Sequence, residues 1–486
     1  MIKKLLSSKY SFYLLLVLAF VVRLYGINNP LADWHSWRQV DTASVSRNFL
    51  DNNFDILHPT YHDLSNVPSD IDNPQGYRFV EFPLYNVLHA SLFSLIGIFT
   101  FEAWGRLITI LSSLITIVFI YLLMKKYADS VSAFFAAFFF SFLPFSIYYS
   151  RTILPDPHMV MAIMGGIYFF DKYLRSDSSK KNENFNYILA IIFTAIAILV
   201  KPYALIFALP MLVLSYQKYG RNFITNKKMY IFLLVTITPF ILWRMWMSQY
   251  PEGIPQSDWL FNDDGIRFKG AFFYWLFAER LGRLILGYWG LILMGFGLLA
   301  ASKPSFLKKE GIFFYSFLIS SLLYLTIIAK GNVQHDYYQI LIIPTVVIFL
   351  GLGSNFLLNP PREHFNKILC SLLLALCIAF TLMFGWYHIR DYYNINNRKI
   401  LEAGSVVDRL TPKDAKIVAL YDGDTTLLYQ TKRSGWASYQ DSLPVLIKKG
   451  ANYLLQLDPT EKDVQSLGEQ YEVIYNTQGI LLVKLK

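Results

Sequence analysis

The chain has 486 residues, of which 54% are hydrophobic, 17% aromatic and only 16% charged. Few soluble folds combine this apolar content with so many separate long apolar runs, so the composition indicates a polytopic membrane protein. The formal net charge of +10 does not indicate a nucleic-acid partner. The lysines and arginines lie mostly in short clusters between apolar runs, which is the pattern of cytoplasmic loops in membrane proteins.

Apolar runs long enough to cross a bilayer recur through the first 390 residues. We expect eleven spans, near residues 11–27, 106–124, 131–149, 158–174, 186–200, 203–217, 229–247, 283–301, 312–329, 337–358 and 366–386. The first run resembles a signal peptide, but no small-residue cleavage site follows it. We therefore expect an uncleaved first helix with a cytoplasmic N-terminus.

The run at 83–101 is ambiguous, and the basic clusters decide how it is placed. If this run lies along the interface or re-enters the membrane, all the later clusters fall on the cytoplasmic side with the N-terminal lysines. These clusters are Lys3–Lys4, Lys125–Lys126, Lys180–Lys181, Lys227–Lys228, Lys308–Lys309 and Arg362 with Lys367. The topology then places 28–82, 150–157, Lys201, 248–282, 330–336 and the C-terminal segment on the outer face.

Beyond residue 391 the apolar spans stop and the pattern becomes mixed. We expect strands at 416–421, 452–457, 471–475 and 480–485, and a helix at 460–470. The predicted organisation is a membrane domain at 1–390, whose first outer loop with interfacial helices covers 28–105, followed by an extracytoplasmic α/β domain at 391–486.

The richest segment is Asp33-Trp34-His35-Ser36-Trp37-Arg38-Gln39-Val40-Asp41, which follows the first span. If it is helical, Asp33 and Asp41 lie about two turns apart and share a face, with Arg38 between them. A carboxylate at a water-poor interface is suited to act as a general base, and an arginine beside it is suited to bind a phosphate. The alternative is a solvated, salt-bridged loop.

Other ionisable residues fall at the predicted outer ends of spans, where such groups are costly and usually functional. They are Glu81, Arg151, Asp156, Lys201, His335 and Asp336. Glu81 is either a ligand-facing acid or a charge favoured near a helix N-terminus, and Asp156 is either functional or a plain turn residue. Arg106, at the start of a span, is expected to snorkel to lipid headgroups.

Several common signals are absent from the sequence. It has no Walker A loop and no serine-hydrolase elbow, so ATP-driven transport and serine-hydrolase chemistry are not expected. No metal-ligand spacing stands out, and Cys370 and Cys377 lie in one apolar run, about 10 Å apart on a helix, too far for a disulfide. We expect no cofactor, and a divalent metal is not indicated.

Taken together, the motifs resemble those of the GT-C membrane glycosyltransferases. The resemblance rests on the early acidic motif His35-x-Trp37-Arg38-Gln39-x-Asp41-Thr42, a Tyr-Ser-Arg-x-x-x-Pro-Asp turn ending at Asp156, and the Lys201–Pro202 step. The nearest branch is glycosyltransferase family 39, with its protein O-mannosyltransferases and aminoarabinose transferases. The resemblance covers roughly residues 1–390.

The resemblance implies an inverting transfer of a sugar from a polyprenyl-phosphate carrier on the outer face of the inner or plasma membrane. A first-loop carboxylate is the implied base, and Arg38, Lys201 and His335 are the implied phosphate ligands. The family members carry an adjacent Asp-Glu pair that this chain lacks, so Asp33 and Asp41 both remain candidates for the base. The remaining candidates for substrate binding are His35, Trp37, Gln39, Glu81, Arg151, Asp156 and Asp336.

The competing hypothesis is a flippase or transporter for lipid-linked sugars. A transporter is expected to carry polar residues near the bilayer midplane, whereas here they gather at outer helix ends, which favours the enzyme. The expected partners are the lipid bilayer, a polyprenyl-phosphate-linked sugar and an envelope acceptor, which is a glycan, a lipid or a protein. No nucleic-acid partner is expected.

Overall fold

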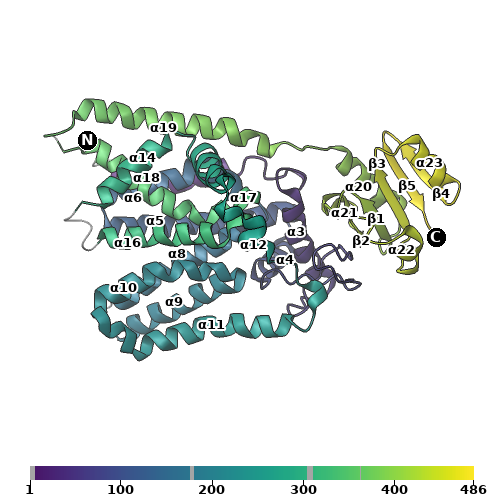
Figure 1. Cartoon of the computed structure of the whole chain (residues 1–486), viewed down its shortest axis with the longest axis horizontal. Helices are drawn as coiled ribbons and strands as arrows, with labels where there is room; N and C mark the ends of the chain where they lie inside the picture. Colours follow the sequence, from purple (N-terminus) through teal and green to yellow (C-terminus); the bar gives the residue numbers. More distant parts are fainter. Residues whose placement is uncertain (1–5, 176–179, 304–309, 362) are drawn as a thin grey trace. The chain divides into compact units, whose positions relative to one another are not determined.

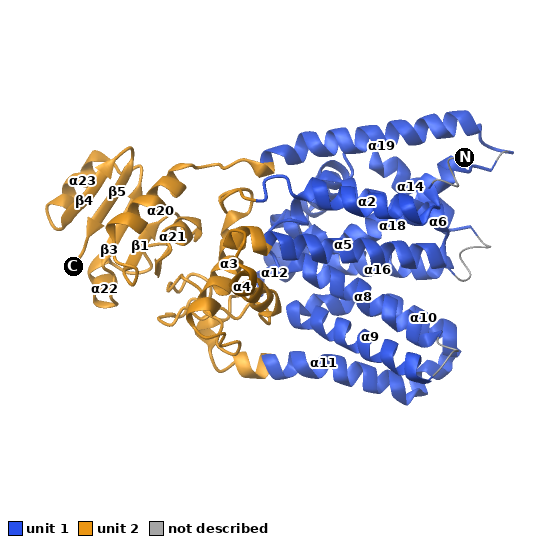
Figure 2. Cartoon of the chain, turned by 180° about the vertical axis from the view of Figure 1, so that it is seen from behind, with its two compact units in different colours: residues 1–27, 106–243, 257–391 blue, residues 28–105, 244–256, 392–486 orange. Residues whose placement is uncertain are grey.

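The protein is mainly helical in the computed structural model, which describes residues 6–175, 180–303, 310–361 and 363–486 (Figure 1). The predicted cytoplasmic residues Lys3, Lys4, Lys308, Lys309 and Arg362 lie outside the described residues. The chain divides into two compact units (Figure 2). Unit 1 comprises residues 1–27, 106–243 and 257–391, and unit 2 comprises residues 28–105, 244–256 and 392–486.

Long apolar helices account for most of unit 1. Its main helices are α2 (Lys9–Arg23), α5 (Phe101–Tyr127), α6 (Ser130–Phe142), α7 (Pro144–Tyr149), α8 (Asp156–Leu174), α9 (Lys180–Val200), α10 (Leu209–Tyr219), α11 (Lys227–Met247), α14 (Gly290–Ala301), α16 (Ile312–Ile327), α18 (Ile343–Leu358) and α19 (Lys367–Ile389). Shorter pieces are α12 (Trp259–Asn262), α13 (Gly270–Phe273), a π-helical stretch (Tyr274–Ile285), α17 (Ala329–Gln334) and a 3₁₀ turn (Asp336–Ile342). The unit boundary falls within α5 and within α11.

Five helices among the described residues are long and apolar enough to cross a membrane alone, and a sixth span results if the pair 270–285 and 290–301, bent by 108°, is counted as one. The other predicted spans are also helical; α8 has 19 residues, and the rest are shorter or interrupted. Pro144 separates α6 from α7, because a proline has no amide hydrogen to continue the helix. The α4 helix (Leu84–Ile96) has 13 residues, fewer than the ~20 that a span needs; its interfacial or re-entrant placement stays a prediction.

Small residues bring some of these helices into close contact. A Cβ atom added to Gly297 of α14 would lie 1.9 Å from the Phe349 carbonyl oxygen of α18, and one added to Gly353 of α18 would lie 1.9 Å from the Leu293 carbonyl oxygen. Glycine is therefore required at both positions. Such backbone contact is a common way to pack helices in a membrane, where burial of apolar surface provides no driving force.

Unit 2 combines the first outer loop with a mixed five-stranded sheet. The loop carries α3 (Ser36–Asp51) and α4, and the C-terminal segment carries the helices α20 (Lys399–Leu410), α21 (Thr426–Gln430), α22 (Leu443–Lys448) and α23 (Glu461–Gly468). The strands are β1 (Lys416–Leu420), β2 (Ser434–Trp436), β3 (Tyr453–Leu457), β4 (Glu472–Thr477) and β5 (Ile480–Lys484). Four predicted strands and the predicted helix are confirmed, whereas β2, α20, α21 and α22 were not predicted.

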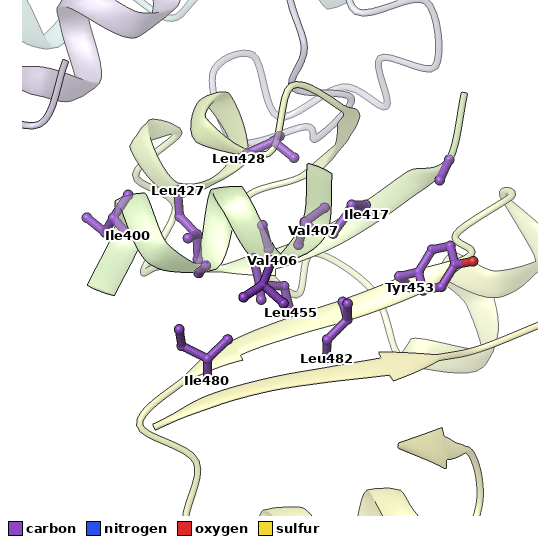
Figure 3. Close-up of a cluster of buried hydrophobic side chains, with 13 residues drawn as sticks. Ile400, Val406, Val407, Ile417, Leu427, Leu428, Tyr453, Leu455, Ile480 and Leu482 are labelled. Carbon is purple, nitrogen blue, oxygen red and sulfur yellow. The ribbon is translucent and has the colours of Figure 1, made fainter. Parts of the chain in front are cut away.

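The sheet has the strand order β2-β1-β3-β5-β4. The β1 strand pairs in parallel with β2 and β3, while β5 pairs antiparallel with β3 and β4. One face packs against α20 and α21 through a buried cluster that includes Ile400, Val407, Leu427 and Leu455 (Figure 3). The other face buries Trp436, Leu446 and Leu481, together with Leu64 from the first outer loop.

The first outer loop also extends the sheet at its β2 edge. The Leu64 amide donates to the Gly435 carbonyl at 2.7 Å, and the Gly435 amide donates to the His62 carbonyl at 2.9 Å. These bonds satisfy backbone groups that an edge strand otherwise leaves open. Asp63 thus forms an isolated parallel bridge with Gly435, which anchors the loop that carries α3 to the C-terminal segment.

Candidate functional site

The α3 helix carries most of the ionisable residues predicted in the first loop. It begins after His35, which adopts a left-handed backbone with φ of 55°, a conformation uncommon outside glycine and often associated with functional sites. The preceding Trp34 stacks on Tyr392 with ring centroids 4.8 Å apart. Trp37 is half-buried, whereas Arg38, Gln39 and Asp41 are buried.

Two ion pairs join α3 to the segment at 78–81. The Nη2 atom of Arg38 lies 2.7 Å from Oε1 of Glu81, and Nη2 of Arg78 lies 2.7 Å from Oδ2 of Asp41. All four side chains are about nine-tenths buried or more. Arg38 also donates through Nη1 to the Thr42 hydroxyl at 3.1 Å, because residues four apart share a helix face.

The second oxygen of Asp41 is held by the C-terminal segment. Oδ1 accepts a hydrogen bond from the Thr425 hydroxyl at 2.7 Å. Both oxygens of Asp41 therefore have a donor, one charged and one neutral. This arrangement fixes the orientation of the carboxylate.

Asp33 has different surroundings. Its side chain is 2% exposed, and Oδ1 accepts a hydrogen bond from Nε2 of Gln39 at 2.8 Å. The same Gln39 atom also donates to the Trp34 carbonyl at 3.2 Å. Of the two predicted acids, Asp41 binds an arginine and a hydroxyl, and Asp33 accepts a hydrogen bond from the Gln39 amide.

The two ion pairs line a pocket, which we call the α3 pocket. It is small, and its lining comprises Arg38, Asp41, Thr42, Val45, Arg78, Val80, Glu81, Pro83 and Asn86. Asn86, from α4, donates to the Thr42 carbonyl at 2.7 Å and to the Ser46 hydroxyl at 3.1 Å. These bonds hold α4 against α3. The pocket is therefore lined by two packed helices together with the segment at 78–83.

Two further titratable side chains of unit 2, His62 and Asp63, were not predicted from the sequence. His62 contacts the Ser44 hydroxyl through Nδ1 and the Thr425 carbonyl through Nε2 at 3.3 Å. Burial lowers the pKa of His62 to about 4, and burial raises the pKa of Asp63 to about 6, although Ser65 donates two hydrogen bonds to that carboxylate. The contacts fit a neutral imidazole that donates from Nε2 and accepts at Nδ1.

In unit 1, Lys201 and Asp156 form a buried ion pair. The ammonium Nζ lies 2.7 Å from Oδ1 of Asp156, and the two side chains are 10% and 3% exposed. Three tyrosine rings surround the ammonium at 5.6–5.8 Å from their centroids, namely Tyr203, Tyr337 and Tyr338. Cation–π attraction therefore adds to the ion pair.

The His335–Asp336 pair lies close to these tyrosines. The His335 ring stacks on Tyr337 with centroids 5.6 Å apart. Asp336 is fully buried, and its Oδ1 accepts a hydrogen bond from the Tyr149 hydroxyl at 2.5 Å. The two neighbouring residues thus each contact a tyrosine.

Two buried arginines of unit 1 bind backbone carbonyls just beyond the end of α2. Arg151 donates from Nη2 to the Gly26 carbonyl at 2.9 Å, and Arg106 donates from Nη1 to the Ile27 carbonyl at 2.8 Å. The expectation that Arg106 snorkels to headgroups is wrong, because its side chain is fully buried. Carbonyls that follow a helix end need donors, and the two guanidinium groups supply them.

The structure thus brings the predicted residues together in two groups. Arg38, Asp41 and Glu81 meet in unit 2, and Asp156 meets Lys201 in unit 1. Sequence reasoning missed Arg78, Thr425, Tyr149, Asn86, His62 and Asp63. The only sequence signal for Arg78 is its place three residues before Glu81. No local pattern marks Thr425.

Comparisons with known proteins agree with this architecture. Residues 83–246 match the family model described as dolichyl-phosphate-mannose-protein mannosyltransferase. ArnT from Cupriavidus metallidurans, in a crystal structure with undecaprenyl phosphate, superposes with a TM-score of 0.68 at 14% identity and covers 98% of each chain. No curated protein matches the chain.

The oligosaccharyltransferase of Archaeoglobus fulgidus, in a complex with zinc and sulfate, superposes with a TM-score of 0.60 at 13% identity, over 96% of this chain and 72% of that one. The same archaeal enzyme, AglB, in complex with an inhibitory peptide and a dolichol-phosphate, gives a TM-score of 0.57 at 11% identity. These likenesses show the fold, and the family match covers about a third of the chain. The chain shares the fold of ArnT and of the archaeal oligosaccharyltransferase.

Proposed function

We propose that the protein transfers a sugar from a polyprenyl-phosphate carrier, of the undecaprenyl-phosphate type, to an acceptor of the cell envelope. The observation that carries the proposal is the set of buried acids and arginines on α3 and at 78–81 in a GT-C fold. Support for a lipid-phosphate donor comes from ArnT with its undecaprenyl phosphate and from AglB with its dolichol-phosphate. Such a donor supplies its own leaving group, so no nucleotide site is needed.

The reaction requires one base. The acceptor oxygen or nitrogen attacks the anomeric carbon, the bond between that carbon and the phosphate oxygen breaks, and its electron pair leaves with the phosphate. The acceptor proton passes to a carboxylate, and the sugar carbon is inverted.

We assign the base to Asp33 and a positioning role to Asp41. Arg78 and Thr425 bind both oxygens of Asp41, so this carboxylate is engaged in the contacts that hold α3 to the segment at 78–81 and to the C-terminal segment. Asp33 is buried just before α3, where Gln39 donates to its Oδ1. Both were candidates from the sequence, and the structural engagement of Asp41 is the reason for the choice.

Lys201 is the proposed main contact of the carrier phosphate. An ammonium has three N–H donors, and Asp156 accepts one of them. Arg151 and His335 are secondary candidates. We also propose that residues 28–82 and the C-terminal segment face outward from the inner or plasma membrane, with the N-terminus in the cytoplasm.

The test uses purified full-length protein, radiolabelled polyprenyl-phosphate sugars and membrane acceptors. We expect label transfer by the wild type, and its loss in Asp33→Asn. The matched control is Asp51→Asn at the exposed end of α3, for which transfer is unchanged. Transfer that survives Asp33→Asn and Asp41→Asn together contradicts the base assignment. If no donor supports transfer while labelled carrier crosses vesicle membranes, the protein is a flippase and the proposed function is wrong.

A further inference from the structure

The stretch of chain that carries Asp33, the proposed base, is held on both sides of this residue by the C-terminal segment. Just before Asp33, the Leu31 carbonyl accepts a hydrogen bond from Nε2 of Gln430 at 3.0 Å. Just after it, the Trp34 amide donates to the Tyr392 carbonyl at 3.1 Å, and the two rings stack with centroids 4.8 Å apart. Residues beyond 391 therefore fix the backbone on either side of the carboxylate.

The C-terminal segment also contacts α3 along its length. At the first residue of the helix, the Thr426 hydroxyl donates to the Ser36 hydroxyl at 3.0 Å. The hydrogen bond to Asp41 follows in the first half of the helix. Nearer its end, the Arg47 guanidinium lies 4.0 Å from the centroid of the Tyr429 ring. Because these contacts are spread along α3, they fix its direction as well as its start.

The contacts come from a well-packed part of the C-terminal segment. Leu427 and Leu428 of α21 are fully buried in the cluster that covers one face of the sheet (Figure 3). A Cβ atom added to Gly404 of α20 would lie 2.5 Å from the Gln430 carbonyl oxygen, so the two helices are in close backbone contact. The α21 helix thus joins the sheet to the stretch that carries Asp33. Groups supported by packed elements keep their geometry better than groups on loops.

A general base must keep its place relative to the acceptor, since a displacement of about 1 Å can lower a rate about a hundredfold. We propose that Gln430 and Thr426 are positioning residues that hold Asp33 in place through the residues on either side of it. The C-terminal segment is then part of the catalytic apparatus and not a separate module that binds the acceptor. The inference rests on the proposed sugar transfer and deepens it, because it gives this segment a role in the transfer step.

The first experiment measures sugar transfer by purified full-length protein, for Gln430→Ala, Thr426→Val and the double variant. In the double variant we expect kcat to fall about tenfold to a hundredfold, while the KM values for donor and acceptor change less than about twofold. Thr426→Ser keeps the hydroxyl and is expected to retain the wild-type kcat. Gln465→Ala, at an exposed position of α23, is the matched control and leaves kcat unchanged. A higher acceptor KM at unchanged kcat overturns the proposal in favour of acceptor binding.

Hydrogen exchange of the same proteins tests the contacts without any substrate. In the double variant we expect the amides of residues 31–36 to exchange about tenfold faster or more, the effect of losing hydrogen bonds worth about 1.4 kcal/mol, while those of β3 and β5 keep the wild-type rate. If the double variant does not fold, Gln430→Ala alone serves, since Gln430 is half-buried. Unchanged exchange at 31–36, or faster exchange with an unchanged kcat, overturns the proposal. Absence of transfer in the wild type contradicts the proposed function instead, and the exchange rates still show whether Gln430 and Thr426 hold this stretch.

Discussion

The contacts of Asp41 lead to a quantitative prediction. Asp41→Asn keeps the shape of the side chain but leaves the Arg78 guanidinium, whose side chain is 11% exposed, without its carboxylate. Breaking a buried ion pair by removing one partner destabilises a protein by about 3–5 kcal/mol. We expect the lower end, about 3 kcal/mol, because the guanidinium keeps its contact with the Tyr61 ring at 4.8 Å. For a unit of this size that corresponds to a fall of about 6–12 °C in unfolding temperature.

The assay is thermal unfolding of the purified protein, followed by tryptophan fluorescence, for Asp41→Asn, Arg78→Gln and the double variant. Since the double variant leaves no unpaired charge, we expect its destabilisation to be at least about 2 kcal/mol smaller than the sum of the singles. Asp51→Asn is the control. Additive effects in the double variant, or an Asp41→Asn protein that unfolds within 2 °C of the wild type, refute the reasoning. For Asp33→Asn we expect the unfolding temperature of the wild type and no sugar transfer. This result would separate the catalytic role proposed for Asp33 from the positioning role proposed for Asp41.

Further predictions concern other buried groups. The folded-state pKa of His62 lies below its ordinary value of 6.5, so the contribution of His62 to stability is lost as pH falls from 6.5 to 4, by about 3 kcal/mol. The folded-state pKa of Asp63 lies above its ordinary value of 3.8, so the contribution of Asp63 is lost as pH rises from 3.8 to 6, by about 3 kcal/mol. Because the two contributions oppose each other, we expect His62→Gln to lose stability as pH rises and Asp63→Asn to lose it as pH falls, in unfolding scans between pH 4 and 6.5. A variant with the pH profile of the wild type argues against its assignment. Lys201→Gln lowers the measured affinity for undecaprenyl phosphate about tenfold or more, whereas equal affinity rules the lysine out as a phosphate contact. Tyr149→Phe removes a hydrogen bond to the buried Asp336 carboxylate. We expect it to lower the free energy of unfolding by about 1.5–3 kcal/mol in denaturant titrations, and a decrease under about 0.5 kcal/mol contradicts a stabilising role for this bond.

Features that depend on local sequence were predictable from the chain alone. The membrane-spanning runs, the short α4 helix and the strands β1, β3, β4 and β5 follow from hydrophobic length, charge placement and alternation. The division into a membrane domain at 1–390 and a separate domain at 391–486 remains a prediction. The structure groups 392–486 with 28–105 and 244–256 in one compact unit.

Pairing between distant residues depended on the tertiary structure. Arg38 and Glu81 are 43 residues apart, Arg78 and Asp41 are 37 apart, and Thr425 lies 384 residues from Asp41. Periodicity reports which face of an element a residue occupies, but it carries no information about which distant side chain meets it. By itself the sequence indicated a membrane protein with acids and arginines in the segment that follows its first span. Only the packing of α3, α4 and the C-terminal sheet decided that Asp41 is held by two donors, and that four charged side chains form a compensated pocket.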